Sequence, residues 1–185
     1  MAKYLLKHGH IVPNGNREYL DGAILIEGDK ILEVYPDSNI ENDDCIEIDL
    51  HGQLLMPKIY QGELSENIEL LNTRSLRSLV KLSLNDNYVL VDVDKIDDMT
   101  LLFIRKNIRR NRFILRSLNV SEAFLRMKNL GFSYCDLVLM SSINLYEASG
   151  VEVSGLLRGL RSDFVVLDKD FHVIFEVDNG EFIYD

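Results

Sequence analysis

The stretch His51-Gly52-Gln53-Leu54-Leu55-Met56-Pro57 decides how the sequence is divided. Before it, Ile46, Ile48 and Leu50 alternate with acidic residues, which is the period-two pattern of a half-buried strand. The apolar Leu-Leu-Met run then ends at Pro57, and proline lacks the N–H donor that a continuing strand needs. The stretch therefore predicts the last strand of an N-terminal β region and the start of a different structure.

The two ends of the chain carry strand patterns separated by turn signals. Gly28-Asp29 predicts a tight hairpin near the N-terminus, and Asn179-Gly180 between alternating apolar residues is a strong hairpin signal near the C-terminus. Gly9 is expected to break the first strand. The predicted strands are residues 4–7, 10–12, 23–27, 30–35, 45–50, 164–167, 172–177 and 182–184.

Neither terminal block has enough strands for a stable sandwich of its own. The economical prediction is one β domain from residues 1–57 together with 151–185, interrupted by an insert over residues 58–150. In the insert, residues 88–91 and 113–115 are expected as strands. Asp97 or Asp98 is expected to open a helix between them, which makes a βαβ-like fragment.

Further helices are predicted in the insert from their capping residues. Ser65 is expected to cap one helix, and Asn119 with Glu122 three residues later has the capping-box spacing. Gly131 is a natural C-cap, and Ser133 with Asp136 starts another short helix.

Composition excludes several classes of protein. The chain has 185 residues, 46% of them apolar, and 20 Lys and Arg against 30 Asp and Glu give a net charge of -10, which disfavours nucleic-acid binding. Cys45 and Cys135 form no CxxC pair or disulfide framework. With no signal peptide and no membrane-length apolar run, we expect a cytoplasmic protein that binds neither membranes nor nucleic acids.

Four stretches resemble the amidohydrolase superfamily, and one of them, residues 177–184 (VDNGEFIY), resembles the closing hairpin of the N-acetylglucosamine-6-phosphate deacetylases. Residues 51–57 resemble the strand that leads into the metal-bearing (β/α)8 barrel. Residues 133–150 (SYCDLVLMSSINLYEASG) resemble the last barrel helix, and residues 155–168 (GLLRGLRSDFVVLD) resemble the return to the β domain, with Ser162 in place of an alanine.

The resemblance implies a metal site that this sequence lacks the residues to build. After the proline, the family continues Gly-Phe-Ile-Asp-x-His-x-His, whereas Glu63 and Ser65 stand here in place of the two histidines. No histidine lies between His51 and His172, and a full barrel needs about 250 residues. The fold expected is therefore α/β (α+β): a composite β-sandwich from both termini with a reduced α/β insert, without metal or cofactor.

Carboxylates in the insert are the candidates for chemistry. Glu63 stands at a former ligand position, and Asp92 and Asp94 follow a predicted strand, where α/β sites usually lie. Carboxylates alone suit Mg²⁺ or Ca²⁺ better than Zn²⁺. The favoured alternative is that the aspartates end the strand and cap the next helix.

A basic run offers a phosphate or partner site. Arg105, Arg109 and Arg112 are the candidates for binding a phosphorylated sugar or an acidic partner. The alternative is a solvated helix face that pairs with acidic neighbours. His8-Gly9-His10 has the spacing of two ligands on one strand face, but exposed strand histidines are the favoured interpretation.

These observations leave three hypotheses. The first is a catalytically degenerate, deacetylase-like binding or assembly module, whose former barrel-packing surface is covered by a second copy or a partner protein. The second is an amide hydrolase with a rebuilt site for a phosphorylated amino sugar. The third, a decayed gene product, is opposed by the consistent strand and cap signals.

Overall fold

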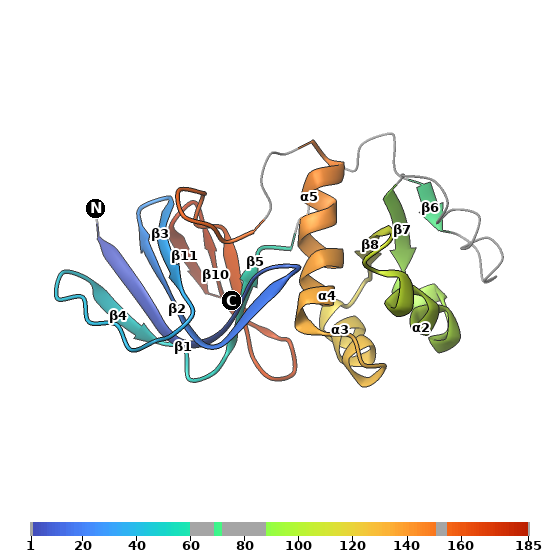
Figure 1. Cartoon of the computed structure of the whole chain (residues 1–185), viewed down its shortest axis with the longest axis horizontal. Coiled ribbons are helices and arrows are strands. Elements are labelled where there is room, and N and C mark those ends of the chain that lie inside the picture. The colour runs from blue at the N-terminus through green and yellow to red at the C-terminus, as the bar shows by residue number, and fades with distance from the viewer. Residues whose placement is uncertain (1, 60–68, 72–87, 151–154, 185) are drawn as a thin grey trace. The chain divides into compact units, whose positions relative to one another are not determined.

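The computed structural model describes residues 2–59, 69–71, 88–150 and 155–184 (Figure 1). The chain forms two compact units: Met1–Ile59 with Gly155–Asp185, and Tyr60–Ser154. Glu63 and the helix predicted to start at Ser65 lie outside the described residues.

The first unit is built on one eight-stranded sheet with strand order β11-β10-β9-β5-β1-β2-β3, and β4 pairs with β1. β5 pairs antiparallel with β9, so the N-terminal and C-terminal blocks share one sheet, as predicted for the fold. The strands are β1 Lys3–Asn14, β2 Arg17–Glu27, β3 Lys30–Tyr35, β4 Ile46–Asp49, β5 Leu54–Pro57, β9 Phe164–Leu167, β10 Val173–Asp178 and β11 Glu181–Tyr184.

The long strand β1 changes partner half-way along. Its first half pairs in parallel with β4, and His10 and Ile11 pair with β5. An irregularity around Gly9, with His8 at φ 55°, separates the halves, and the turn at His51-Gly52 separates β4 from β5. The prediction that Gly9 ends a strand is wrong, because a β-bulge absorbs the irregularity and lets the strand continue.

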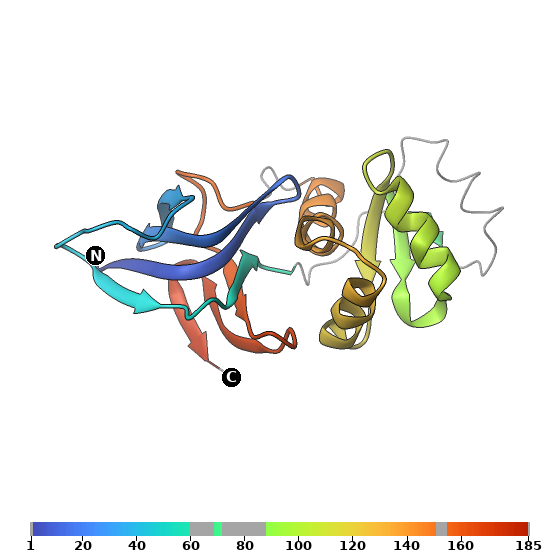
Figure 2. The ribbon, with the colours of Figure 1, turned by 60° about the horizontal axis from the view of Figure 1, so that its bottom comes forward.

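The sheet closes over one large core, and Leu5, Ala23 and Leu25 form a second, smaller buried cluster. Ile26 of β2, Ile31 of β3 and Phe164, Phe175 and Val177 of β9 and β10 belong to one buried cluster. In Figure 2 the blue strands β1–β3 lie along one side of this unit and the red strands β9–β11 along the other. The composite sandwich predicted from the sequence is therefore confirmed, as a sheet folded onto itself.

The second unit contains a three-stranded parallel sheet with order β6-β7-β8. Its strands are β6 Glu69–Leu71, β7 Tyr88–Asp92 and β8 Arg112–Arg116, and helix α2, Asp98–Asn107, connects β7 to β8. The predicted βαβ fragment is confirmed. Leu90 and Ile114 pack with Leu145 on one face of the sheet.

Two capping signals produce the helices that follow β8. The side chain of Asn119 accepts the Glu122 N–H at 3.2 Å at the start of α3, Val120–Asn129. Ser133 and Asp136 form the full capping box of α4, Tyr134–Val138. The helix continues through a π-helical segment, Leu139–Ile143, into α5, Asn144–Ala148.

Candidate functional site

Two candidate aspartates follow β7 and are held by neighbouring protein groups. The Asp92 side chain is 10% exposed and forms an ion pair with Lys95 at 2.8 Å. Asp94 accepts the Ser117 hydroxyl at 2.7 Å on one carboxylate oxygen and the Leu118 backbone N–H at 2.7 Å on the other. Asp94 therefore joins the segment after β7 to the segment after β8.

The next two aspartates begin α2. Asp97 is the N-cap and accepts the Thr100 N–H at 2.8 Å, and hydrogen bonds from Thr100 hold the pKa of Asp97 below its usual value. Asp98 forms an ion pair with Arg126 of α3 at 2.7 Å. All four carboxylates of this stretch thus have partners that stabilise the fold.

Arg126 was not singled out from the sequence. Besides pairing with Asp98, its guanidinium donates to the carbonyls of Val93 at 2.7 Å and Ile96 at 2.8 Å. These carbonyls belong to the 3-10 turn Val93–Lys95 and its C-cap. The only signal for this role was a long cation on a predicted helix, and sequence alone does not indicate which carbonyls such a side chain reaches.

An open hollow of about 390 Å³ lies beside Asp94, where β7 and β8 end. Asp94 and Arg126 both line it, and both already carry the protein contacts given above. Glu122 adds an exposed carboxylate to the lining. The remaining lining residues are Val93, Leu118, Asn119 and Ala123.

The three candidate arginines make three different contacts. Arg105 donates to the Leu130 carbonyl, and Arg109 pairs with Asp136 at 3.1 Å. Arg112 donates to the Tyr88 hydroxyl at 3.1 Å and lies 5.1 Å from the centre of its ring. Their positive charges are therefore used to hold α2, α3, α4 and the sheet together.

The His8-Gly9-His10 motif also pairs with carboxylates. His8 lies 3.1 Å from Asp21 and His10 lies 2.9 Å from Glu18, both on β2. Within the described residues, no group of three or more His, Cys, Asp or Glu side chains is arranged to hold a metal ion.

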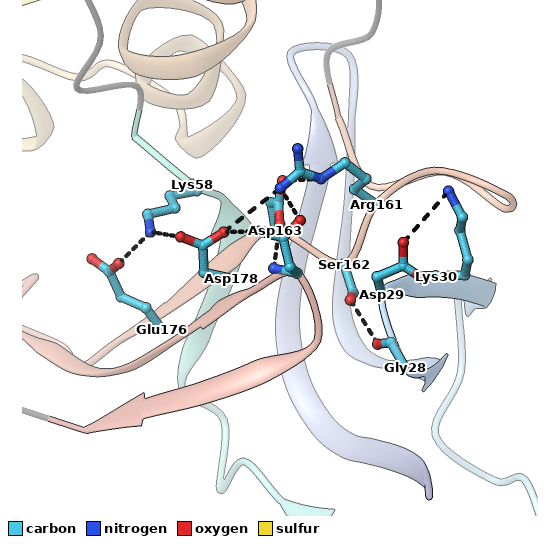
Figure 3. A network of polar contacts seen from close by, with 10 residues as sticks. Gly28, Asp29, Lys30, Lys58, Arg161, Ser162, Asp163, Glu176 and Asp178 are labelled. Atoms are coloured by element: carbon cyan, nitrogen blue, oxygen red, sulfur yellow. Dashed lines mark hydrogen bonds and ion pairs between the residues drawn. The ribbon is translucent and has the colours of Figure 1, made fainter. Parts of the chain in front are cut away.

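A polar network in the first unit surrounds the point at which β5 ends (Figure 3). Lys58 contacts Glu176 at 3.0 Å and Asp178 at 3.1 Å. Burial disfavours the charged form of Lys58, but the hydrogen bonds to both carboxylates outweigh burial and raise its pKa. The protonated amine is thus held as a cation in a structural network, which does not suit a nucleophile.

The same network joins the β10–β11 hairpin to the chain before β9. Asp163 accepts the Asn179 N–H at 2.7 Å and pairs with Arg161 at 3.1 Å (Figure 3). The fully buried Ser162 donates its hydroxyl to the Gly28 carbonyl at 3.1 Å. The serine that stands in place of the family's alanine therefore fastens the β2–β3 turn.

No protein-family model matches the sequence, and no curated protein matches it. Solved structures do match over the whole chain. N-acetylglucosamine-6-phosphate deacetylase from Pasteurella multocida aligns with a TM-score of 0.77 at 11% identity, over 99% of this chain and 100% of the other. The fold of this chain is similar to that of the deacetylase.

Further solved structures support the same fold. A variant of the deacetylase from Mycobacterium smegmatis, in complex with N-acetyl-D-glucosamine-6-phosphate, aligns with a TM-score of 0.79 at 10% identity over 100% of both chains. Beta-aspartyl dipeptidase from Fervidobacterium islandicum AW-1 aligns with a TM-score of 0.64 at 8% identity, over 98% of this chain and 96% of the other. The family resemblance noted in the sequence is confirmed at the level of the fold.

The described residues do not fit the metal centre that the resemblance implies. The four histidines, His8, His10, His51 and His172, all lie in the first unit. Asp92 and Asp94 are bound to protein groups, and Glu63 lies outside the described part of the chain.

In the part of the chain that the structure describes, no helix has the length and apolarity required to cross a membrane.

Proposed function

We propose that this protein is a catalytically degenerate relative of the N-acetylglucosamine-6-phosphate deacetylases that acts as a binding or assembly module and needs no metal or cofactor. The observation that carries the proposal is that the carboxylates after β7 already form ion pairs and hydrogen bonds with other parts of the protein. A hydrolytic metal site needs ligands and a proton-transfer group aimed at the substrate. Here Asp92 and Asp94 are aimed at Lys95 and at the segment after β8.

The histidine distribution supports the same role. Neutral imidazole is the commonest metal ligand in proteins, and histidine occurs in each of the common catalytic zinc sites. Between His51 and His172 the sequence contains no histidine. The insert is thus left with carboxylates and hydroxyls for any metal chemistry.

The alternative is an amide hydrolase that acts on a phosphorylated amino sugar. The hollow beside Asp94 favours it, because ligand sites of α/β proteins lie at the carboxyl ends of parallel strands. In this alternative, Glu63, Asp92 and Asp94 are the catalytic candidates, and Arg105, Arg109 and Arg112 are the phosphate-binding candidates. The three arginines would first have to release the contacts described above.

Two measurements on untagged protein, purified without chelator, separate these functions. The first is metal content by elemental analysis, and the second is acetate release from N-acetylglucosamine-6-phosphate with and without added Zn²⁺, Fe²⁺, Mn²⁺ or Mg²⁺. We expect less than one equivalent of metal and no release above the buffer rate. One equivalent of metal together with release that falls in the Asp92→Asn/Asp94→Asn variant would establish the hydrolase instead.

A further inference from the structure

The hollow beside Asp94, which lies wholly within the second unit, carries two negative charges. Asp94 accepts hydrogen bonds from the Ser117 hydroxyl and the Leu118 N–H, both at 2.7 Å, and neither of these donors is charged. Glu122 is exposed, and its carboxylate has no hydrogen-bond or ion-pair partner among the described residues. Both carboxylates that line the hollow therefore keep their charge.

Arg126 does not balance these two charges. It is the one cation among the described residues that line the hollow. Its guanidinium forms an ion pair with Asp98 at 2.7 Å and donates to two backbone carbonyls. The hollow therefore favours a positively charged occupant, and the net charge of -10 attracts such a partner from a distance.

Leu118 adds an apolar surface at a fixed position on the rim of the hollow. Its side chain is 98% exposed. The backbone on both sides is held, because the Leu118 N–H donates to Asp94 and the Asn119 N–H donates to the Ser117 hydroxyl at 3.1 Å. A partner that packs against Leu118 therefore has to order little additional chain.

We propose that this hollow binds a basic side chain, lysine or arginine, of a partner protein. The charged head lies at the carboxylates of Asp94 and Glu122, and the apolar stem packs against Leu118. Lysine and arginine each carry a cation on a stem of three or four carbons, so one side chain satisfies both features of the hollow. The inference rests on the proposed binding role and names the chemistry of the partner.

The same features disfavour other occupants. Ca²⁺ takes about six to eight oxygen ligands, whereas the described lining supplies two carboxylates, one of which already accepts two hydrogen bonds. A phosphorylated sugar would bring its negative charge next to these carboxylates. Pockets for small molecules usually bury at least about 70% of the ligand, whereas this hollow is open and Leu118 on its rim is almost fully exposed.

Amide chemical shifts of the ¹⁵N-labelled full chain, titrated with short peptides, test the binding. Ac-Leu-Lys-Leu-NH2 and Ac-Leu-Arg-Leu-NH2 should shift the amide signals of Leu118, Asn119 and Glu122, and Ac-Leu-Glu-Leu-NH2 should not. Binding should weaken between 0.1 M and 1 M NaCl, because the Debye length shrinks from about 10 Å to about 3 Å.

Substitutions of exposed residues test the two contacts without threatening the fold. Glu122→Gln should weaken binding of the lysine peptide about two- to fivefold, which is the contribution of one exposed ion pair. Leu118→Asn should weaken it about tenfold, because an apolar contact is lost. Glu147→Gln is the matched control: Glu147 is exposed in the same unit, outside the hollow, and glutamine can still accept its hydrogen bond from Tyr88. This variant should bind like the wild type.

Two further probes distinguish the occupants. The lysine peptide should bind at least about tenfold more tightly than butylammonium, because its flanking residues bury additional apolar surface. Equal affinity would assign the hollow to a free amine, and shifts of the same amides by N-acetylglucosamine-6-phosphate would assign it to the hydrolase alternative. Either result would overturn the inference, as would basic peptides that cause no shift or variants that bind like the wild type.

Failure of this inference can be told apart from failure of the proposed function. A protein that lacks metal and activity and does not bind the basic peptides would leave the proposed non-enzymatic function standing. Metal-dependent acetate release would refute that function whatever the peptides do.

Discussion

A Cβ atom on Gly9 would lie 2.6 Å from Cδ1 of Leu50, closer than side-chain carbons approach one another in folded proteins. Gly9 marks the point at which β1 leaves β4 and joins β5, and Leu50 is fully buried in the core between those strands. The absence of a side chain at position 9 therefore lets the core residue fill the space next to the bulge.

Gly9→Ala should destabilise the protein by about 1–3 kcal/mol, because overpacking displaces a buried side chain. The measurement is urea unfolding at neutral pH. In a Leu50→Ala background the same substitution should cost much less, since the clashing methyl is gone. An equal cost in both backgrounds would show that the contact with Leu50 is not the cause.

Arg126→Gln should lower the free energy of unfolding by about 2 kcal/mol, because it removes charge-assisted hydrogen bonds to the Val93 and Ile96 carbonyls. Arg126→Lys should recover little of this loss, since an ammonium lacks the planar fork of the guanidinium. Arg116→Gln, at an exposed arginine of the same unit, is the control and should change stability by less than about 0.5 kcal/mol.

Asp97→Ala should destabilise the protein at pH 7 and lose its effect in acid. The folded-state pKa of Asp97 lies below the unfolded value, so its stabilisation is present above the unfolded pKa and is lost as pH falls through the folded one. Urea midpoints of wild type and variant, measured from pH 7 downward, should converge below about pH 4. A gap that stays constant would indicate that the carboxylate charge contributes nothing to the cap.

Lys58→Met should destabilise the protein by about 2 kcal/mol at pH 7, because Glu176 and Asp178 lose their shared cation. The pKa of Lys58 is raised, so its contribution is fully present below the unfolded value and is lost as pH rises through the folded one. The gap should therefore narrow above about pH 10.4. Lys30→Met, at a half-exposed lysine 3.9 Å from Asp29, should cost less than about 0.5 kcal/mol.

Interactions between neighbours in sequence could be predicted without the structure. The turn at Asn179-Gly180 has both residues at positive φ, and the short helix predicted to start at Ser133 and Asp136 does so, with a full capping box. Such features depend on a few adjacent residues, whose side-chain lengths and allowed backbone angles determine the outcome. The cap at Asp97 belongs to the same class.

Long-range contacts were decided by the tertiary structure. Arg126 reaches carbonyls some thirty residues earlier in the chain, and Ser162 reaches the Gly28 carbonyl across 134 positions. The sequence identified Asp92 and Asp94 as catalytic candidates. Only the fold showed that Asp92 forms an ion pair with Lys95, and that Asp94 accepts hydrogen bonds from the Ser117 hydroxyl and the Leu118 N–H.

By itself, the sequence determined the types of the strands and helices in the described residues, the amidohydrolase resemblance and the missing histidines. The tertiary structure decided that β1 pairs first with β4 and, beyond a bulge, with β5. It also decided that the charged side chains proposed as catalytic or binding candidates form contacts that stabilise the fold. The physical reason is that periodicity and capping are local, whereas the partner of a buried or charged group depends on which distant segment the packed core brings to it.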